Sequence, residues 1–590
     1  MLDDAMAREQ ESSQHGRRAE QGDEPPHAAR LTRRELLVVA AATVVAGCAT
    51  TPHPHATPTT TPYVLNRAVT VGTDGTLSLA LRDALLKRFG QVSGITGATT
   101  VRAEASPDFT VTFGALPAGY TPVSIGASAI CLFTHPRVPV DSVKALQASE
   151  LLQGGVTDWK AVGAPSTLPV RVLALAGLPL PSGLTLGPSS ATHATVEDLV
   201  TALRTQPGSI ALAPVECADW SMRNLGVEGA YPAQGRGDSG ALGAYTLRLG
   251  VSKSLISKGF RPEAMARALA PALASATPVV DLAVAGDIML GRGVNNKMVA
   301  YNDYLYPYRQ IADELHGADL RVANLECTIT DLYPVPTDPS TFDFVSAKRA
   351  VEGLVYAGFS ALTVANNHAG GAGPGALQDM IATLRGKAIA VCGGGDNLAA
   401  ARQPALMKAK GLRVALLGYD AISPQEPYAT TSSPGLAPLD LATLAQDITS
   451  ARAQADLVIP YFHWGIEYTK DPTADQQRAA HAAIDAGADV VLGVHPHWVQ
   501  GIESYKGKLI LYSFGNFIFD QDWSRPTMEG LLVHLYWRGT TLVGVRFVPT
   551  LDVDRCQPRP MTQAEAVDVF DRMWSGTDML ASGQYGPEPE

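Results

Sequence analysis

The sequence predicts an α/β protein with two globular halves. Three observations support this prediction. Of the 590 residues, 46% are hydrophobic and only 17% are charged, a composition that builds large cores and excludes wholesale disorder. Short apolar runs typical of strands alternate with helical segments along most of the chain. In the second half several of these runs end in polar residues, as strands that lead into a ligand site do.

The net charge of the chain argues against a nucleic-acid partner. Lysine and arginine number 46 against 57 aspartate and glutamate residues, which gives a net charge of −11. Because an acidic chain without basic blocks binds nucleic acid poorly, no nucleic-acid partner is expected. Apart from one N-terminal stretch, no apolar run approaches the ~20 residues of a membrane span, which excludes a polytopic transporter.

Residues 1–48 have the pattern of an export signal. Arg33-Arg34 resemble a twin-arginine signal, and the apolar run that follows is too short to span a bilayer. The run ends in Val45-Ala46-Gly47-Cys48, which resembles a bacterial lipobox. A buried N-terminal helix with a chance cysteine is the alternative. We expect Cys48 to be lipidated, 49–64 to be a Pro/Thr-rich tether, and the mature protein to lie on the outer face of the cytoplasmic membrane.

Residues 65–275 form the first predicted domain. A strand, a turn and a helix open it, at 68–71, 72–76 and 77–89. Such a turn can present backbone N–H groups to an anion. Three later segments resemble, in their order, those of the phosphate-type periplasmic substrate-binding proteins: 136–140, 151–159 and 207–212. The resemblance implies a binding-protein-like fold. Because Ser182-Gly183-Leu184 lacks the threonine of that family's anion loop, a domain kept for surface recognition competes with a working anion binder.

Residues 276–555 form the second predicted domain, and a helix at 561–574 and a frayed tail are expected within 556–590. Helices are predicted near 346–356, 374–386, 441–453 and 473–486. Apolar runs between them end in polar residues, namely Asp287, Glu326, Asn367 with His368, His463, and His495 with His497. Because the carboxyl ends of parallel strands share one edge of a sheet, we expect these residues to gather.

The polar residues at the strand ends have the chemistry of a metal site. Taken singly, each has an ordinary explanation such as a helix cap or a turn. Together, a carboxylate pair, a carboxamide and three or four imidazoles are ligands of Mn²⁺, Zn²⁺ or Fe²⁺. His495 and His497 are two residues apart, so in an extended segment both rings lie on one side. Such a set suits two ions that share a bridging carboxylate.

The order of these residues is similar to that of the calcineurin-like metallophosphoesterases, and the local motifs resemble the CapA family of poly-γ-glutamate capsule synthesis proteins. The motifs are G-D-x-M-L at 286–290, N-L-E at 324–326, A-N-N-H at 365–368, H-W-G-x-E-Y at 463–468 and G-x-H-P-H-x-x-Q at 493–500. Over about 279–550 the resemblance implies a metallophosphoesterase-like α/β/β/α sandwich that performs metal-assisted hydrolysis or transfer. The implied partners are an anionic envelope polymer or phosphoester substrate and the membrane proteins of capsule synthesis.

The resemblance also implies a role for individual residues. The metal ligands would be Asp287, Glu326, Asn367, His463, His495 and His497, and they would hold two ions of Mn, Zn or Fe. His368 occupies the general-acid position near a leaving-group oxygen. Substrate-binding or ligand-supporting positions are implied for Asn324, Trp464, Glu467 and Tyr468, with packing around the ligands as the alternative.

Two departures from the family pattern bear on activity. Met289 stands where a metallophosphoesterase has its second ligand, and a thioether is too soft for a hydrolytic site. After His368 the family usually has an acidic residue, but 369–373 contain only alanine and glycine. A non-enzymatic scaffold or sensor that binds an anionic polymer is therefore the alternative to a metal-dependent hydrolase.

Overall fold

The computed structural model describes residues 65–587, except 93, 103–105, 238–241, 339 and 423–427. The expected signal at 1–48, with Cys48, and the tether at 49–64 lie outside the described residues. No helix in the described part of the chain is long and apolar enough to cross a membrane.

A ten-stranded sheet is built from the first part of the described chain. Its strands are β1 (Arg67–Thr73), β2 (Ile95–Arg102), β3 (Phe109–Thr112), β4 (Tyr120–Thr134), β5 (Ser142–Val143), β6 (Arg171–Leu175), β7 (Ala191–His193), β8 (Ser209–Pro214), β9 (Arg223–Val227) and β10 (Ala244–Ser252). The order is β2-β1-β3-β10-β4-β8-β6-β7, and β9 pairs with both β4 and β5. Its helices are α1 (Leu79–Phe89), α2 (Ala145–Gln153), α3 (Val196–Thr205), α4 (Lys253–Ser257) and α5 (Pro262–Leu269).

The predicted strand and helix that open this part are confirmed as β1 and α1. The helix begins at Leu79 because the Ser78 side chain caps it, accepting a hydrogen bond from the backbone N–H of Leu81 at 3.3 Å. Two clusters of buried apolar side chains lie on the sheet. One contains Phe89 of α1, and the other contains Leu199 of α3.

The second part of the chain contains two larger sheets. The first has the order β16-β15-β12-β11-β26-β27-β28, with β25 beside β11. Its strands are β11 (Val279–Ile288), β12 (Leu320–Leu325), β15 (Ala361–Thr363), β16 (Ala390–Cys392), β25 (Asn516–Ile518), β26 (Glu529–Arg538), β27 (Thr541–Val553) and β28 (Gln557–Pro560). Strands β11, β12, β15 and β16 are mutually parallel, whereas β26, β27 and β28 are antiparallel to their neighbours.

The second sheet has the order β18-β19-β21-β22-β24-β23. Its strands are β18 (Ala405–Ala409), β19 (Leu412–Asp420), β21 (Leu457–His463), β22 (Val490–Val494), β23 (Ile502–Tyr505) and β24 (Lys508–Leu511). The four inner strands are parallel. Two short pairs accompany the large sheets, β13 (Thr328–Ile329) with β14 (Val345–Ser346) and β17 (Gly394–Gly395) with β20 (Gly435–Leu436).

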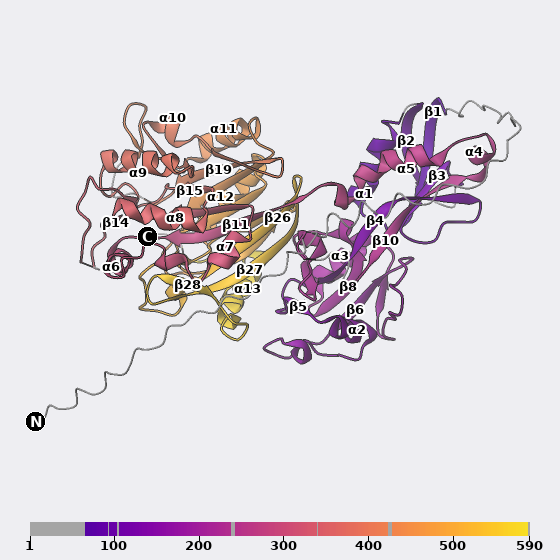
Figure 1. Ribbon diagram of the computed structural model, residues 1–590, viewed down its shortest axis with the longest axis horizontal. Coiled ribbons are helices and arrows are strands. Elements are labelled where there is room, and N and C mark those ends of the chain that lie inside the picture. Colours follow the sequence, from indigo (N-terminus) through magenta and orange to yellow (C-terminus); the bar gives the residue numbers. More distant parts are fainter. Residues whose placement is uncertain are drawn as a thin grey trace, which may run out of the picture. The chain divides into compact units, whose positions relative to one another are not determined.

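The two large sheets pack face to face between helices. One buried cluster joins them and contains Val284, Val322, Ile459 and Leu492. Helices cover both outer faces (Figure 1). They are α6 (Arg292–Ala300), α7 (Ala312–His316), α8 (Val351–Ala357), α9 (Pro374–Gly386), α10 (Leu398–Ala401), α11 (Leu441–Arg452) and α12 (Ala474–Asp485). The predicted α/β/β/α sandwich is confirmed.

The end of the chain differs from the sequence expectation. A helix at 561–574 and a frayed tail from 575 are expected, but α13 spans Val567–Ala581. Met573 and Leu580 are both buried, and their spacing of two helical turns places them on one face. This buried face holds the helix together past residue 575. Strand β28 pairs with β27, so the segment after 555 contributes to the sheet.

Candidate metal centre

The carboxyl ends of the parallel strands from both sheets meet at one site. The first sheet supplies Asp287 at the end of β11, Glu326 just after β12 and Asn367 after β15. The second supplies His463 at the end of β21, with His495 and His497 after β22. All of these side chains except Asn367 are buried. The structure therefore brings together the six residues that the sequence singles out.

The candidate ligands form three overlapping groups of three residues. Within each group the ligand atoms lie within 4.8 Å of one another. The first is Asp287, Glu326 and His497, and the second is Glu326, His463 and His495. Glu326 belongs to both, which is the position of a bridging carboxylate. The third group joins His495 and His497 to Glu467, a residue expected from sequence to bind substrate or support the ligands.

Buried polar atoms in the centre lack partners. Both carboxylate oxygens of Glu326 and Nδ1 of His495 have no hydrogen-bond partner among the described residues. Burial, and then the charges of Asp287 and Glu467, raise the pKa of Glu326 well above its usual value. Because burying an unpaired polar group is unfavourable, these unpaired atoms have the chemistry and the placement of candidate cation ligands.

Two imidazoles in the centre, those of His463 and His495, are held neutral, the state in which histidine binds a metal. Burial, and then the neighbouring imidazoles, keep the pKa of both His463 and His495 well below the usual value. His463 Nε2 lies 2.8 Å from Asn367 Oδ1, and its Nδ1 lies 3.3 Å from Asn324 Nδ2. Nε2 also lies 3.9 Å from Glu326 Oε1, so it is the ring nitrogen that faces the centre and would reach an ion.

Two asparagines hold the ligands of the first sheet in place. Asn324 donates to Asp287 Oδ1 at 2.8 Å and accepts a hydrogen bond from Asn366 Nδ2 at 3.0 Å. The Asn366 carbonyl oxygen in turn accepts the backbone N–H groups of His368 and Ala369. Asn366 thus fixes the turn that carries Asn367 and His368. In the sequence Asn366 stands out only as a member of the A-N-N-H motif at 365–368, and its supporting role follows from these buried contacts.

Asn516 is the second supporting residue, and its Gly515-Asn516-Phe517 turn favours a structural over a catalytic role from the sequence. Its Nδ2 donates to the carbonyl oxygen of Thr527 at 2.8 Å, so its Oδ1 must face His497 Nδ1, 2.9 Å away. Nδ1 of His497 therefore carries the proton, and Nε2 is free to bind an ion.

The backbone between the two histidines is not extended, contrary to the sequence expectation. His495 has a φ of 97° and His497 a φ of 57°. Both lie in the left-handed region, which non-glycine residues rarely adopt and which recurs at functional sites. The two rings still face one site, with centroids 5.8 Å apart. Their convergence results from this bend and not from the alternation of a strand.

His368 borders the centre and is held by an aromatic ring. Its imidazole stacks on Phe344, with centroids 3.9 Å apart and planes 24° apart. The Arg292 guanidinium lies 4.4 Å from the centroid of the same Phe344 ring. This packing orients His368 where the family's acidic residue is missing. Burial, and then the charge of His497, lower the pKa of His368 to about 3, so this structure holds the imidazole neutral.

The four residues implied to bind substrate or support the ligands separate into two pairs. Asn324 and Trp464 are buried, so neither reaches the opening of the site. Trp464 packs between Phe462 and Tyr512, with centroids 4.7 and 5.9 Å away, which is the packing alternative. Glu467 and Tyr468 are exposed at the edge of the centre. Only this second pair can meet a substrate.

The candidate anion turn of the first domain is already occupied. The backbone N–H of Leu79, the first residue of α1, donates to the Glu197 carboxylate at 2.8 Å. The neighbouring Gly75 carbonyl accepts the backbone N–H of Val196 at 3.1 Å. The start of α3 therefore fills the position in which an anion would bind the N-terminus of α1.

We expect inorganic phosphate not to bind this domain, because it would have to displace the Glu197 carboxylate. Calorimetric titration of the full chain with phosphate should give no saturable heat. EDTA is included so that phosphate does not bind through ions in the metal centre. Saturable binding in EDTA that strengthens in a Glu197→Ala variant would contradict this expectation.

The fold and the site define a metallophosphoesterase-like protein with a candidate metal centre. Residues 281–521 match the family of the bacterial capsule synthesis protein PGA_cap. Over 306 residues the chain is 32% identical to the capsule biosynthesis protein CapA of Bacillus anthracis, covering 50% of this chain and 73% of that protein. It is also 32% identical over 286 residues to the PGA biosynthesis protein CapA of Bacillus subtilis, covering 48% and 74%. This chain belongs to the CapA family of bacterial capsule synthesis proteins.

Two solved structures are similar to parts of this chain. The NAD nucleotidase of Haemophilus influenzae covers 52% of this chain and 60% of its own, with 11% identity and a TM-score of 0.31. An ABC-type phosphate transport receptor of Vibrio cholerae covers 34% and 93%, with 13% identity and a TM-score of 0.26.

Proposed function

We propose that this chain is an exported, lipid-anchored protein of capsule synthesis whose metal centre hydrolyses or transfers an anionic envelope polymer. Poly-γ-glutamate or a phosphoester is the substrate class that fits the family. The names of the two CapA relatives, which refer to capsule and PGA biosynthesis, support the pathway. The twin-arginine and lipobox pattern that ends at Cys48 supports export and anchoring.

The observation that carries the catalytic part is the buried Glu326 carboxylate, which has no hydrogen-bond partner among the described residues and lies beside the rings of His463, His495 and His497. Asp287, Glu326 and His497 would hold one ion, and Glu326, Asn367, His463 and His495 the other. The chemistry that such ions supply is Lewis acidity, which activates water and polarises a phosphoryl or acyl oxygen. Asn324 and Asn516 orient the ligands that they contact.

The charges of the centre fit an anionic substrate. Asp287, Glu326 and Glu467 contribute three negative charges, and two divalent ions would contribute four positive charges. The loaded centre would carry about one net positive charge, which attracts a carboxylate polymer or a phosphoester. Tyr468 and Glu467 lie at the opening, where this substrate would enter.

The test is the metal content of the full chain, purified without chelator, measured by mass spectrometry beside a His495→Ala variant. We expect close to two ions per chain in the parent and loss of both in the variant, because His495 belongs to two of the three groups of candidate ligands. His481→Ala is the matched control, since this partly buried histidine of α12 pairs with Glu503 outside the centre. A metal-free parent, or a His495→Ala variant that keeps its metal, would overturn the proposal.

A second candidate function is binding of the polymer without turnover, as a scaffold or sensor beside the membrane proteins of capsule synthesis. The loop after His368 favours it, because no acidic side chain there can return a proton to the imidazole. Phosphoester and γ-glutamyl substrates distinguish the two candidates. Metal-dependent turnover by the loaded chain supports the hydrolase, and saturable polymer binding without turnover supports the scaffold.

A further inference from the structure

The two halves of the metal centre are unequally supplied with donors. Glu326, Asn367, His463 and His495 give one half four, whereas Asp287, Glu326 and His497 give the other only three. Divalent ions of this class take at least four ligands. The three-donor half therefore needs another group from the chain or from solvent.

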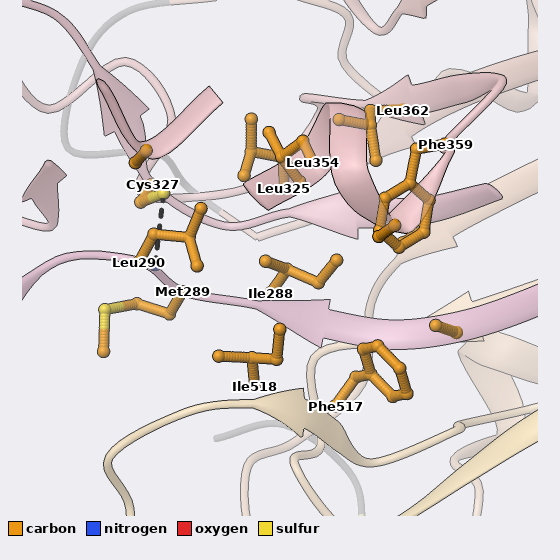
Figure 2. Packing of buried hydrophobic residues seen from close by; sticks show 14 of the residues in the cluster. Ile288, Met289, Leu290, Leu325, Cys327, Leu354, Phe359, Leu362, Phe517 and Ile518 are labelled. Atoms are coloured by element: carbon orange, nitrogen blue, oxygen red, sulfur yellow. Dashed lines mark hydrogen bonds between the residues drawn. The ribbon is translucent and has the colours of Figure 1, made fainter. Parts of the chain in front are cut away.

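Met289 does not supply the missing donor. Its side chain is fully buried in the apolar cluster under the first sheet, among Leu290, Ile518 and their neighbours (Figure 2). Its sulfur accepts the backbone N–H of Gly291 at 3.1 Å. The thioether is thus turned into the core and already has a hydrogen-bond donor.

Glu467 is placed where that donor is needed. Its Oε1 lies 3.9 Å from His497 Nε2, the ring nitrogen that Asn516 leaves free. Glu467, His495 and His497 together form one group of candidate ligands, whose ligand atoms lie within 4.8 Å of one another. Glu326 and His495 both have buried side-chain atoms without a hydrogen-bond partner among the described residues. Glu467 therefore lies beside polar atoms that an ion could bind.

Two backbone hydrogen bonds fix the turn that carries Glu467. The N–H of Trp464 donates to the Val494 carbonyl at 3.1 Å, and the N–H of Tyr468 donates to the Pro496 carbonyl at 2.8 Å. Tyr468 has a φ of 60°, a conformation that surrounding structure must enforce. The turn is thus tied to the same segment that presents His495 and His497.

The exposure of Glu467 needs an explanation at the mouth of a site for anionic polymers. Its side chain is 41% exposed, and a free carboxylate there would repel the substrate. Bound to a cation, the same carboxylate is neutralised and the repulsion disappears. Both the position and the charge of Glu467 therefore favour a role as a metal ligand.

We propose that Glu467 is a metal ligand that completes the three-donor half formed by Asp287, Glu326 and His497. This inference rests on the proposed metal centre. It replaces the substrate-contacting role that the sequence implies for Glu467. It also explains how the chain dispenses with a ligand at Met289, since a carboxylate from another strand end supplies the donor.

The experiment loads the full chain with Mn²⁺, removes free metal and measures ions per chain by mass spectrometry and affinity by calorimetry. Glu467→Ala removes the donor oxygen, and Glu467→Gln keeps an oxygen without its charge. We expect the parent to bind two ions. In the alanine variant we expect one ion to be lost or bound at least about tenfold more weakly, with a smaller effect for glutamine. Glu352→Gln is the control, because Glu352 is a similarly exposed glutamate that pairs with Arg349.

The outcomes separate this inference from the proposed function. Two ions of parental affinity in Glu467→Ala, with loss of both in His495→Ala, would overturn the role of Glu467 and leave the metal centre intact. A parent that binds no Mn²⁺ would overturn both. Circular dichroism establishes that the variants are folded, and the exposed position of Glu467 predicts that they are.

Discussion

A Glu326→Gln variant is expected to be more stable than the parent without metal and less stable than the parent with metal. In the metal-free protein the Glu326 carboxyl is fully buried and has no hydrogen-bond partner among the described residues, and its two nearest histidine nitrogens lie 3.9 and 4.0 Å away. Replacing it by a neutral amide of the same shape removes the cost of burying an acid, worth about 1–3 kcal/mol. Thermal unfolding in EDTA at pH 7 measures this gain.

With metal bound, the difference in stability between variant and parent reverses its sign. Ions that bind only the folded state stabilise the parent, by about 3 kcal/mol when the free metal is a hundredfold above its dissociation constant. The glutamine variant lacks the carboxylate that two of the ligand groups share, so added metal should increase its stability only a little. The parent and variant unfolding temperatures should therefore change order when metal is added. A variant less stable than the parent in EDTA would contradict this, because it would mean that Glu326 has a stabilising partner without metal.

Glu529 offers a matched control for this experiment. Its carboxylate is equally buried but is paired with Arg525 and Arg572, each at 2.7 Å. Breaking a buried ion pair costs about 3–5 kcal/mol, since the remaining charge is left without its partner. Glu529→Gln should therefore destabilise the protein both with and without metal, and the gain that metal provides should match that of the parent.

The ligand set could be predicted from the sequence because its geometry follows from a simple rule. Each donor stands directly after an apolar run, and the ends of parallel strands share an edge of a sheet. Helix α9 lies at the predicted residues, 374–386, and β22 (Val490–Val494) is the apolar run that precedes His495. The rule does not predict that the second sheet packs on the first. That packing comes from the cluster of buried residues between the two sheets.

The supporting contacts could not be predicted, because they join residues that no periodicity relates. Asn516 reaches His497 across 19 residues of chain, and its orientation depends on the Thr527 carbonyl. Glu197 reaches the start of α1 from 118 residues away. The place of Glu467 depends on backbone hydrogen bonds to Val494 and Pro496, which flank His495. Each is a tertiary contact, and the sequence shows only residues able to make it.

Gly286→Ala is expected to be among the most damaging single substitutions in the second domain. A Cβ at this position would lie 2.0 Å from the carbonyl oxygen of Gly515 and 3.2 Å from Cβ of Phe514. The clash is with backbone, so no side-chain rotation relieves it. The Asp287 N–H donates to that same Gly515 carbonyl at 3.2 Å, so relief of the clash must pull Asp287 away from the turn that leads to Asn516. We expect a loss of about 3 kcal/mol or more in unfolding free energy.

Urea denaturation and metal content together test this expectation. The variant should unfold at lower urea and bind less metal, because the displaced strand carries Asp287 and its neighbour β25 begins with Asn516. Gly375→Ala is the control, since Gly375 lies in α9 with no atom within 4 Å of the added methyl group. Alanine there should be neutral or stabilise the helix by up to about 1 kcal/mol. Parental stability and metal content in Gly286→Ala would show that β11 and the 515–516 turn approach less closely than this, and Asp287 would then need another support.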